Sequence, residues 1–206
     1  MKTTIKFFVC ATIIALLQGC ASLSKEECLV ADWQQIGFED GSRGRDLLTL
    51  ARHRKACAKA GITPDRAAYE RGHRQGLLRY CNYQTGLSLG ERGSSKPTFC
   101  PAESLAQFDR GYAHGIERFQ QQQLIGDIQS DIQSLETRIA DYQDSLDHYE
   151  AVIISDDSSS EERAIALEEI RDKELELKLL ESELIAAQNA LSFEQQNLQR
   201  LIDSQH

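Results

Sequence analysis

The chain has 206 residues, of which 41% are hydrophobic and 27% charged, and its formal net charge is −9. An acidic chain is not expected to bind nucleic acid or anionic lipid headgroups, because their phosphates carry charge of the same sign. Beyond the first twenty residues, no apolar run is long enough to span a membrane.

The N-terminus reads as a secretory signal over residues 1–19. Lys2 and Lys6 make its start basic, and its apolar run over residues 5–17 is too short to cross a bilayer as a helix. Residues 17–20, LQGC, resemble the lipobox of bacterial lipoproteins, which implies that Cys20 is acylated and becomes the mature N-terminus. Ala21, rather than Asp, follows it, which favours the outer membrane, with the protein facing the periplasm. The alternative is an ordinary cleaved signal in which the cysteine stands by chance.

Four further cysteines follow Cys20: Cys28, Cys57, Cys81 and Cys100. An even number in an oxidising compartment predicts two disulfides, and three pairings are possible. The order of the expected helices favours Cys28–Cys57 and Cys81–Cys100, because Cys28 opens one helix and Cys57 closes the next, while Cys81 ends a third and Cys100 starts a fourth. A zinc site is the alternative, but no C-x-x-C spacing supports it, and no metal is expected.

Composition and charge divide the chain near residue 120. Residues 20–119 contain 15 basic against 12 acidic residues, and residues 120–206 contain 6 against 20. All three prolines, the only Trp and nearly every glycine of the mature chain lie in the first part. We therefore predict an all-α protein with a small, disulfide-bonded, Gly-rich helical domain over 20–119 and a different helical architecture over 120–206.

The first domain shows four helix signals. The expected helices begin at the Ser24 capping box, near Asp46, at Thr63-Pro64-Asp65 and at Pro101-x-Glu103. The first is expected to run through Cys28 and Trp33, and the second to end at Gly61. Residues 82–99, rich in Gly and Ser, are expected to form a loop.

A twelve-residue pattern occurs twice, as YERGHRQGLLRY at 69–80 and FDRGYAHGIERF at 108–119. In each copy an aromatic residue, two glycines and a second aromatic residue are spaced by three, four and four, which places them on one helix face. Four glycines inside helices sacrifice about 4 kcal/mol of helix propensity. Close packing of each helix against the other or against a third helix is the expected compensation, and residues 33–44 are a weaker third copy. The predicted packing residues are Tyr69, Gly72, Gly76, Tyr80, Phe108, Gly111, Gly115 and Phe119.

Residues 120–206 contain two heptad segments. Apolar residues alternate three and four apart over 125–153 and again over 166–201, and the polar sequence SDDSSS separates the two segments. This pattern predicts an antiparallel coiled-coil hairpin with a turn at about 155–160. Lys173 and Glu194 fall on the seam. An intermolecular coiled coil is the alternative, and a dimer of hairpins would combine both.

Catalytic motifs are lacking from the sequence. It contains no P-loop, dinucleotide fingerprint, H-E-x-x-H or G-x-S-x-G motif. A histidine paired with Asp40 or Asp65 is one acid–base hypothesis, and exposed or locally hydrogen-bonded histidines are the simpler interpretation. We predict a non-enzymatic protein without cofactor or small-molecule substrate.

The pattern of cysteines, glycines and aromatic residues over about 20–119 resembles a family of small proteobacterial lipoproteins that is known only as a domain of unknown function. The residues that carry the resemblance are Cys28, Asp32, Trp33, Gly37, Asp40, Gly41, Gly44, Cys57, Gly61, Asp65, Tyr69, Gly72, Gly76, Leu77, Tyr80, Cys81, Gly86, Gly90, Gly93 and Cys100. The resemblance implies an envelope location and a disulfide-bonded domain, and it implies no activity. The heptad segments lie outside it.

Three functional hypotheses follow. The first is an outer-membrane lipoprotein whose hairpin binds an envelope protein or a second copy of itself. The second is a module that binds cell-wall glycan or peptide through the arginines and the aromatic side chains of Trp33, Tyr69, Tyr80 and Tyr112. The third, an enzyme, has the least support in the sequence.

Overall fold

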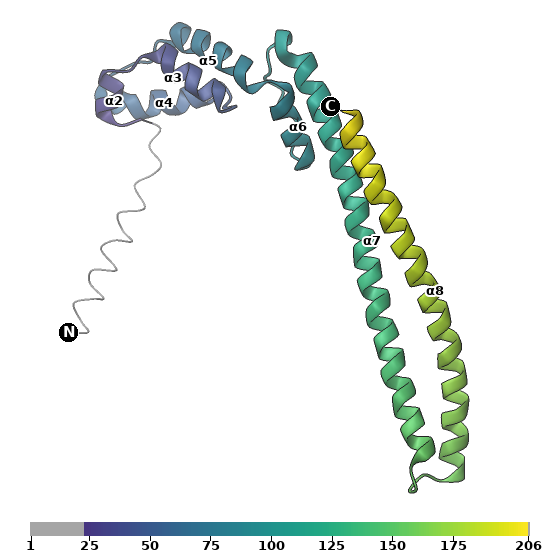
Figure 1. The fold of residues 1–206 in the computed structure, drawn as a ribbon. Helices are drawn as coiled ribbons and strands as arrows, with labels where there is room; N and C mark the ends of the chain where they lie inside the picture. Colours follow the sequence, from purple (N-terminus) through teal and green to yellow (C-terminus); the bar gives the residue numbers. More distant parts are fainter. Residues whose placement is uncertain (1–22, 206) are drawn as a thin grey trace, which may run out of the picture. The chain divides into compact units, whose positions relative to one another are not determined.

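The computed structural model describes residues 23–205, and this range is helical with connecting turns and no β-strand (Figure 1). The predicted all-α class is therefore confirmed. The predicted signal peptide and the lipidation site at Cys20 lie outside the described residues. The elements are α2 (Lys25–Leu29), α3 (Trp33–Ser42), α4 (Thr49–Cys57), η2 (Ala58–Ala60), α5 (Arg66–Tyr80), α6 (Tyr83–Glu91), α7 (Ala102–Ile154) and α8 (Ser160–Ser204).

The described residues form two compact units. The first unit contains residues 23–89 and 95–113, and the second contains residues 90–94 and 114–205. The division falls inside α6 and α7.

Side-chain caps explain where the first helices begin. The predicted single helix from Ser24 through Trp33 is wrong, because α2 ends at Leu29 and a separate helix, α3, begins at Trp33. Asp32 starts α3 by accepting hydrogen bonds from the backbone N–H groups of Gln34 and Gln35, at 3.0 and 3.1 Å. An aspartate at this position satisfies donors that the first helical turn leaves unpaired.

Two other helix starts also differ from expectation. Helix α4 begins at Thr49, three residues after Asp46, and no side chain caps it. Helix α5 is capped by Asp65, which accepts from the backbone N–H of Ala68 at 2.9 Å, so the cap is not Thr63. The predicted end of the second helix at Gly61 is confirmed, because Gly61 closes η2 with a φ of +72°.

The predicted loop over 82–99 is wrong in its first half, which forms helix α6. The side chain of Asn82 accepts from the backbone N–H of Thr85 at 2.9 Å and starts the helix. Gly86 is a packing position here, because a Cβ added to it would overlap the carbonyl oxygen of Phe108. Gly86, which suggested a loop, instead allows α6 to lie against α7.

The repeated Gly-x3-Gly segments each pack against a third helix. On α5, a Cβ added at Gly72 would overlap the carbonyl oxygen of Gln34, and one at Gly76 would overlap that of Phe38. On the facing helix α3, a Cβ added at Gly37 or at Gly41 would likewise overlap backbone atoms of α5. The two backbones therefore touch without side chains between them.

The second copy repeats this arrangement with α6 as the facing helix. A Cβ added at Gly111 would overlap the carbonyl oxygen of Tyr83, and Gly115 is buried. Tyr69 and Phe108, which begin the two copies, are both fully buried. The predicted packing role thus applies to both copies, with α3 and α6 as the partners.

The aromatic residues that end the two copies also have matching positions. The ring of Tyr80 covers Gly44, and the ring of Phe119 covers Gly93. Gly44 and Gly93 have φ values of +70° and +61°, in the left-handed region that favours glycine. A side chain at either position would be strained and would also displace the ring.

Two disulfides join elements of the first unit. Cys28 is bonded to Cys57 and Cys81 to Cys100, which is the pairing favoured from the sequence, and the zinc alternative is therefore wrong. The first disulfide lies in a core with Trp33, Leu50 and Tyr69. The second lies in a core with Leu77 and Phe108. Disulfides that close loops of this size contribute about 3 kcal/mol each.

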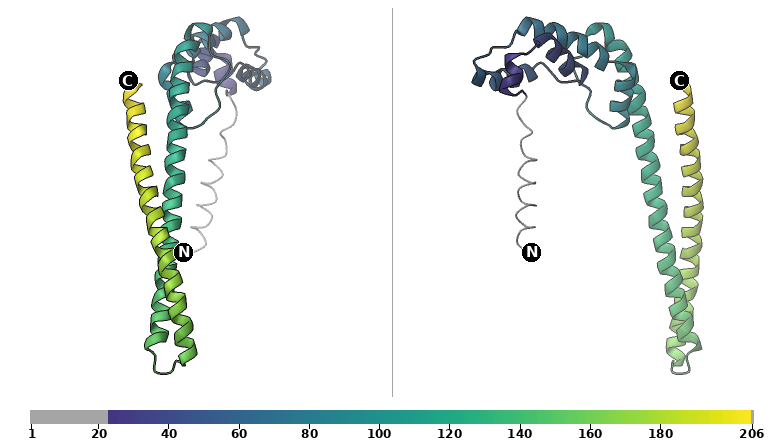
Figure 2. Two further views of the ribbon diagram at one scale, coloured as in Figure 1. Left: turned by 90° about the vertical axis from the view of Figure 1, so that its right-hand side faces the viewer. Right: turned by 60° about the vertical axis from the view of Figure 1, so that its left-hand side comes forward.

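In the second unit, α7 and α8 lie side by side and run antiparallel (Figures 1 and 2). Helix α7 ends at Ile154 and α8 begins at Ser160, so the predicted turn is confirmed. Ser159 and Glu162 form a capping box at the start of α8. Every predicted seam position of both helices is buried or half-buried, including Lys173 and Glu194. The predicted intramolecular hairpin is confirmed.

Candidate functional site

The first unit contains a buried polar cluster centred on Asp40 of α3. Its Oδ2 atom accepts hydrogen bonds from His53 Nε2 of α4 and from the Tyr69 hydroxyl of α5, both at 2.7 Å. Its Oδ1 atom accepts from Arg45 Nη1 at 2.9 Å. One carboxylate therefore joins three helices and the segment that follows α3.

The bonds to Asp40 outweigh the cost of burying its charge. Burial acts to raise the pKa of the Asp40 carboxyl, but the hydrogen bonds from His53 and Tyr69, the attraction of His53 and the bond from Arg45 together hold that pKa below its usual range. Burial and the bond to Asp40 raise the pKa of Tyr69. Asp40 is thus an anion near neutral pH, and His53 Nε2 and Tyr69 are donors to it.

The Asp40–His53 pair resembles an acid–base pair in its geometry but not in its surroundings. The side chains of Asp40 and His53 are each only 3% exposed, and the ring of Trp33 lies 6.5 Å from that of His53. His53 Nδ1 is buried without a hydrogen-bond partner. The pair is therefore enclosed in a core rather than placed at a cleft. The other hypothetical partner, Asp65, serves as the cap of α5.

His53 and His73 correct the expectation of exposed or locally bonded histidines, because both are buried and bond to residues distant in sequence. His73 Nε2 bonds to the carbonyl oxygen of Arg45, at 2.6 Å. Arg45 is thereby held through both its side chain and its backbone. His73 therefore fixes the segment between α3 and α4 onto α5, and His53 joins α4 to α3.

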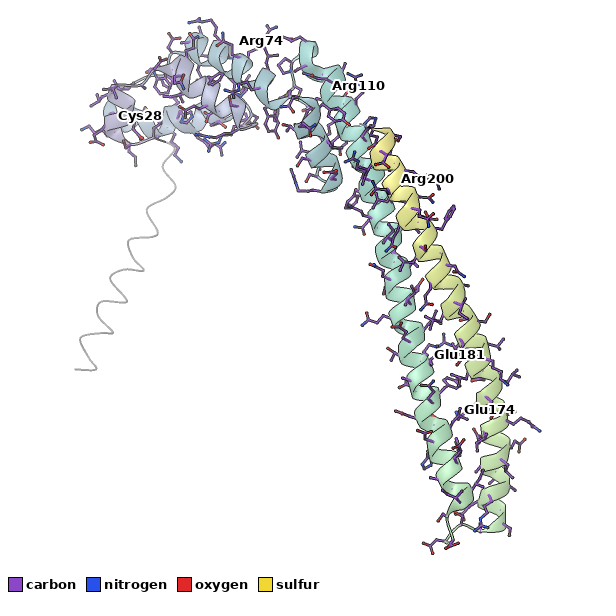
Figure 3. All side chains as sticks on the ribbon, viewed as in Figure 1. Cys28, Arg74, Arg110, Glu174, Glu181 and Arg200 are labelled. Atoms are coloured by element: carbon purple, nitrogen blue, oxygen red, sulfur yellow. A yellow bond between two sulfur atoms is a disulfide. The ribbon has the colours of Figure 1, made fainter. Side chains whose placement is uncertain are left out.

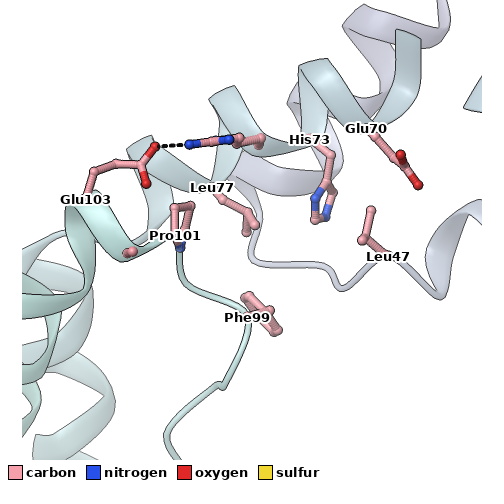
Figure 4. Close-up of a pocket in the computed structure, with 9 residues that line it drawn as sticks. Leu47, Glu70, His73, Leu77, Phe99, Pro101 and Glu103 are labelled. Carbon is pink, nitrogen blue, oxygen red and sulfur yellow. Dashed lines mark hydrogen bonds and ion pairs between the residues drawn. The ribbon is translucent and has the colours of Figure 1, made fainter. Parts of the chain in front are cut away.

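A groove of about 530 Å³ lies beside His73 in the first unit (Figure 4). It is lined by Leu47, Glu70, His73, Arg74, Leu77, Phe99, Pro101, Ala102 and Glu103. Three of these residues are charged, namely Glu70, Arg74 and Glu103, and Arg74 donates to Glu103 at 2.8 Å. The remaining surface is mainly apolar, with Leu77 and Phe99 facing the groove in Figure 4.

The aromatic surface considered for cell-wall binding is not assembled in the first unit. Trp33 and Tyr69 are core residues, and Tyr80 and Tyr112 are half-buried. A sugar-stacking platform requires an exposed ring face, which neither Trp33 nor Tyr69 offers. Among residues 23–205 there is also no group of three or more His, Cys, Asp or Glu side chains arranged to hold a metal ion.

In the second unit, polar side chains are paired across the hairpin seam. The ammonium of Lys173 lies 5.2 and 5.9 Å from the ring centroids of Tyr142 and Tyr149. Glu194 accepts from Gln121 Nε2 at 2.8 Å. These pairs fix the register of the two helices, as polar seam residues do in coiled coils.

The open end of the hairpin is closed by Arg118, whose side chain is 9% exposed. Its guanidinium donates to Glu91 at 2.9 Å and to Gln205 at 2.8 Å. Gln205 in turn donates to Glu117 at 2.9 Å. The end of α8 is thus held against the first residues of α7 that belong to the second unit.

One signal in the sequence would have revealed α6. Gly37, Gly41 and Gly44 have spacings of four and three, and Gly86, Gly90 and Gly93 repeat them. The first set lies in the weaker third copy of the glycine repeat, and the second lies in the predicted loop. Both sets mark a helix that faces a Gly-x3-Gly helix and ends at a glycine covered by an aromatic ring.

Together these features define a disulfide-bonded helical domain, built from two glycine-packed helix pairs and followed by a coiled-coil hairpin. Residues 32–117 match the model of DUF2799, a family described as protein of unknown function. The match begins at the cap of α3 and ends in α7, so it includes both glycine-packed pairs and leaves most of the hairpin outside. The prediction of a domain of unknown function followed by a helical extension is confirmed.

Neither curated proteins nor solved structures gave a significant match. Among residues 23–205, none of the helices combines the length and apolar character that crossing a bilayer requires.

Proposed function

We propose that the chain is a non-enzymatic outer-membrane lipoprotein, anchored through acylated Cys20, whose α7–α8 hairpin is an interaction arm for a protein of the envelope. The main support for this proposal is the length of the hairpin. Its part beyond residue 120 extends about 50 Å at 1.5 Å per residue. A hairpin of this length exceeds what the small first unit needs for its own cores, and its exposed side chains are available to a partner (Figure 3).

The lipid anchor is supported by the signal-like segment 1–19 and by the LQGC sequence that ends at Cys20. The two disulfides fit an oxidising compartment such as the periplasm. The absence of a catalytic role is supported by the enclosure of the Asp40 cluster and by the pairing of Arg74 with Glu103 at the groove.

Replacing Cys20 with serine is expected to move the protein from the membrane fraction to the soluble periplasmic fraction. The substitution removes the thiol that would carry the lipid, and three acyl chains supply nearly all of the membrane affinity. Metabolic labelling with a fatty-acid analogue would show incorporation in the parent protein and none in the variant. Equal labelling and equal membrane recovery of both proteins would contradict the anchor.

Shortening the hairpin is expected to reduce strongly the yield of its crosslinks to a partner while leaving the first unit folded. Deleting residues 141–154 and 160–173 together removes two heptads from each helix, about 21 Å of arm. The deletion keeps the turn and the seam phase, and Glu176 takes the place of Glu162 three residues after Ser159. Crosslinking in cells is the measurement, and an unchanged crosslinking pattern would contradict the arm function.

A further inference from the structure

Helix α8 carries a second apolar row outside the hairpin seam. Ile165, Leu179 and Phe193 are spaced by two whole heptads, so they lie along one line of the supercoiled helix. They are 55%, 59% and 57% exposed. Ala186, also exposed, lies midway between the last two, whereas Asp172 lies midway between the first two, so the row is continuously apolar only from Leu179 to Phe193. Large apolar side chains are rarely aligned in this way on a surface that faces only water.

An acidic row runs between this apolar row and the seam. Its members are seven residues apart: Glu162, Glu169, Glu176 and Glu183. At its end, Glu183 lies with Asp131 and Arg138 of α7 around a hollow of about 310 Å³. This edge of the hairpin therefore combines an apolar row with carboxylates from both helices.

The edge of α8 on the other side of the seam has a different pattern of charge. It carries Glu174 and Glu181, labelled in Figure 3, and the row next to it contains Arg171 and Lys178. Charges of both signs are mixed there, and its exposed apolar residues Leu167 and Ile185 stand singly in two different rows. The edge with Leu179 and Phe193 differs because a glutamate recurs at every heptad from Glu162 to Glu183 beside its exposed apolar side chains.

We propose that this edge binds a basic amphipathic helix of a partner protein, which lies along α8 as a third helix of the coiled coil. The inference rests on the proposed arm function and names the face and the chemistry of the partner. Apolar residues of the partner at heptad spacing would cover the row of Leu179 and Phe193, and its Lys and Arg residues would pair with the row that contains Glu176 and Glu183. A second copy of this chain is the wrong occupant, because residues 120–206 carry 20 acidic and 6 basic residues and would repel each other.

A synthetic peptide tests the chemistry with the purified full chain. The probe is an amphipathic peptide of about four heptads, with Leu at seam positions and Lys elsewhere. Leu179→Gln with Phe193→Gln is expected to weaken its binding about tenfold or more, since each side chain loses apolar contact without any change of charge.

The matched control variant is Leu167→Gln with Ile185→Gln, which replaces side chains that are 59% and 60% exposed on other faces of α8. It is expected to change binding less than about twofold. Helical content by circular dichroism should be the same in all three proteins. Equal weakening by both variants would mean that apolar side chains on any face of α8 contribute to binding, and no weakening by either would mean that charge alone holds the peptide. Either result would overturn the proposal.

Photo-crosslinking in cells separates this inference from the arm function. A crosslinking amino acid is placed at Leu179, at Leu167 or at Ser158 of the turn. Crosslinks at Leu179 to a basic segment with heptad apolar spacing in another protein support the proposal. Crosslinks only at Leu167 or Ser158 overturn the proposed face and leave the arm function standing. A crosslinked dimer of this chain overturns the choice of partner, and no crosslink at any position overturns both.

Discussion

Replacing Gly72 with alanine is expected to destabilise the first unit by about 3 kcal/mol, and by more if α3 and α5 cannot separate. The added methyl group would occupy the position of the Gln34 carbonyl oxygen, with the backbone N–H of Phe38 only 3.0 Å from it. Neither atom belongs to a flexible side chain that can move away. The two helices would have to part along their whole contact, which would also loosen the core around Tyr69.

Urea unfolding followed by tryptophan fluorescence measures this effect. Trp33 is the only tryptophan of the chain and belongs to the core that α3 and α5 share, so its signal reports on the first unit alone. Gly126→Ala is the control, because nothing lies within 4 Å of a Cβ added there. It should leave the fluorescence transition unchanged and stabilise α7 by about 1 kcal/mol. A Gly72→Ala transition within about 1 kcal/mol of the parent protein would contradict direct backbone packing.

The hairpin is the part of the fold that the sequence predicts best. A seam needs only that apolar residues recur three and four apart, and this periodicity is local and unbroken over 125–153. The turn is equally local, since Ser159 and Glu162 form a capping box within four residues. Residues that interact within a few positions of each other produce a pattern that can be read directly from the sequence.

The glycine-packed pairs are less predictable from the sequence, because glycine can either end a helix or allow close helix packing. At Gly61 it ends a helix through a positive φ, and at Gly86 it allows a neighbouring backbone to approach. Composition alone favoured a loop for residues 82–99. Only the repeated spacing of Gly86, Gly90 and Gly93 distinguishes the second use from the first.

The Asp40 cluster could not be predicted from sequence spacing. His53 is 13 residues from Asp40 and Tyr69 is 29 residues away, and the three side chains come from three helices. Their meeting depends on how closely α3 approaches α5 and on the disulfide that joins α2 to the end of α4. Tertiary packing therefore decides which of several possible carboxylates a histidine meets.

Replacing Asp40 with asparagine is expected to cost about 3–5 kcal/mol of folding stability, as loss of one partner does for buried ion pairs. The amide removes the negative charge that Arg45 and His53 face. It also has one acceptor oxygen where the carboxylate serves three donors. Glu39→Gln is the matched control on the same helix, because Glu39 is exposed and its contact with Arg43 is 3.5 Å long. The control should change stability by less than about 0.5 kcal/mol. Both variants are measured by urea unfolding with the Trp33 signal.

The pH dependence of the stability difference between the parent protein and Asp40→Asn identifies the cause of that difference. Because the pKa of Asp40 is lower in the folded protein than in the unfolded chain, its charge stabilises the fold fully above the unfolded pKa of about 3.9. That contribution is lost as the pH falls through the folded pKa, since the carboxyl is then protonated in both states. Asparagine does not titrate. The gap between the parent protein and Asp40→Asn should therefore be largest above about pH 5 and shrink below about pH 4. A gap that stays constant down to acid pH would mean that shape alone, and not the carboxylate charge, holds α3, α4 and α5 together.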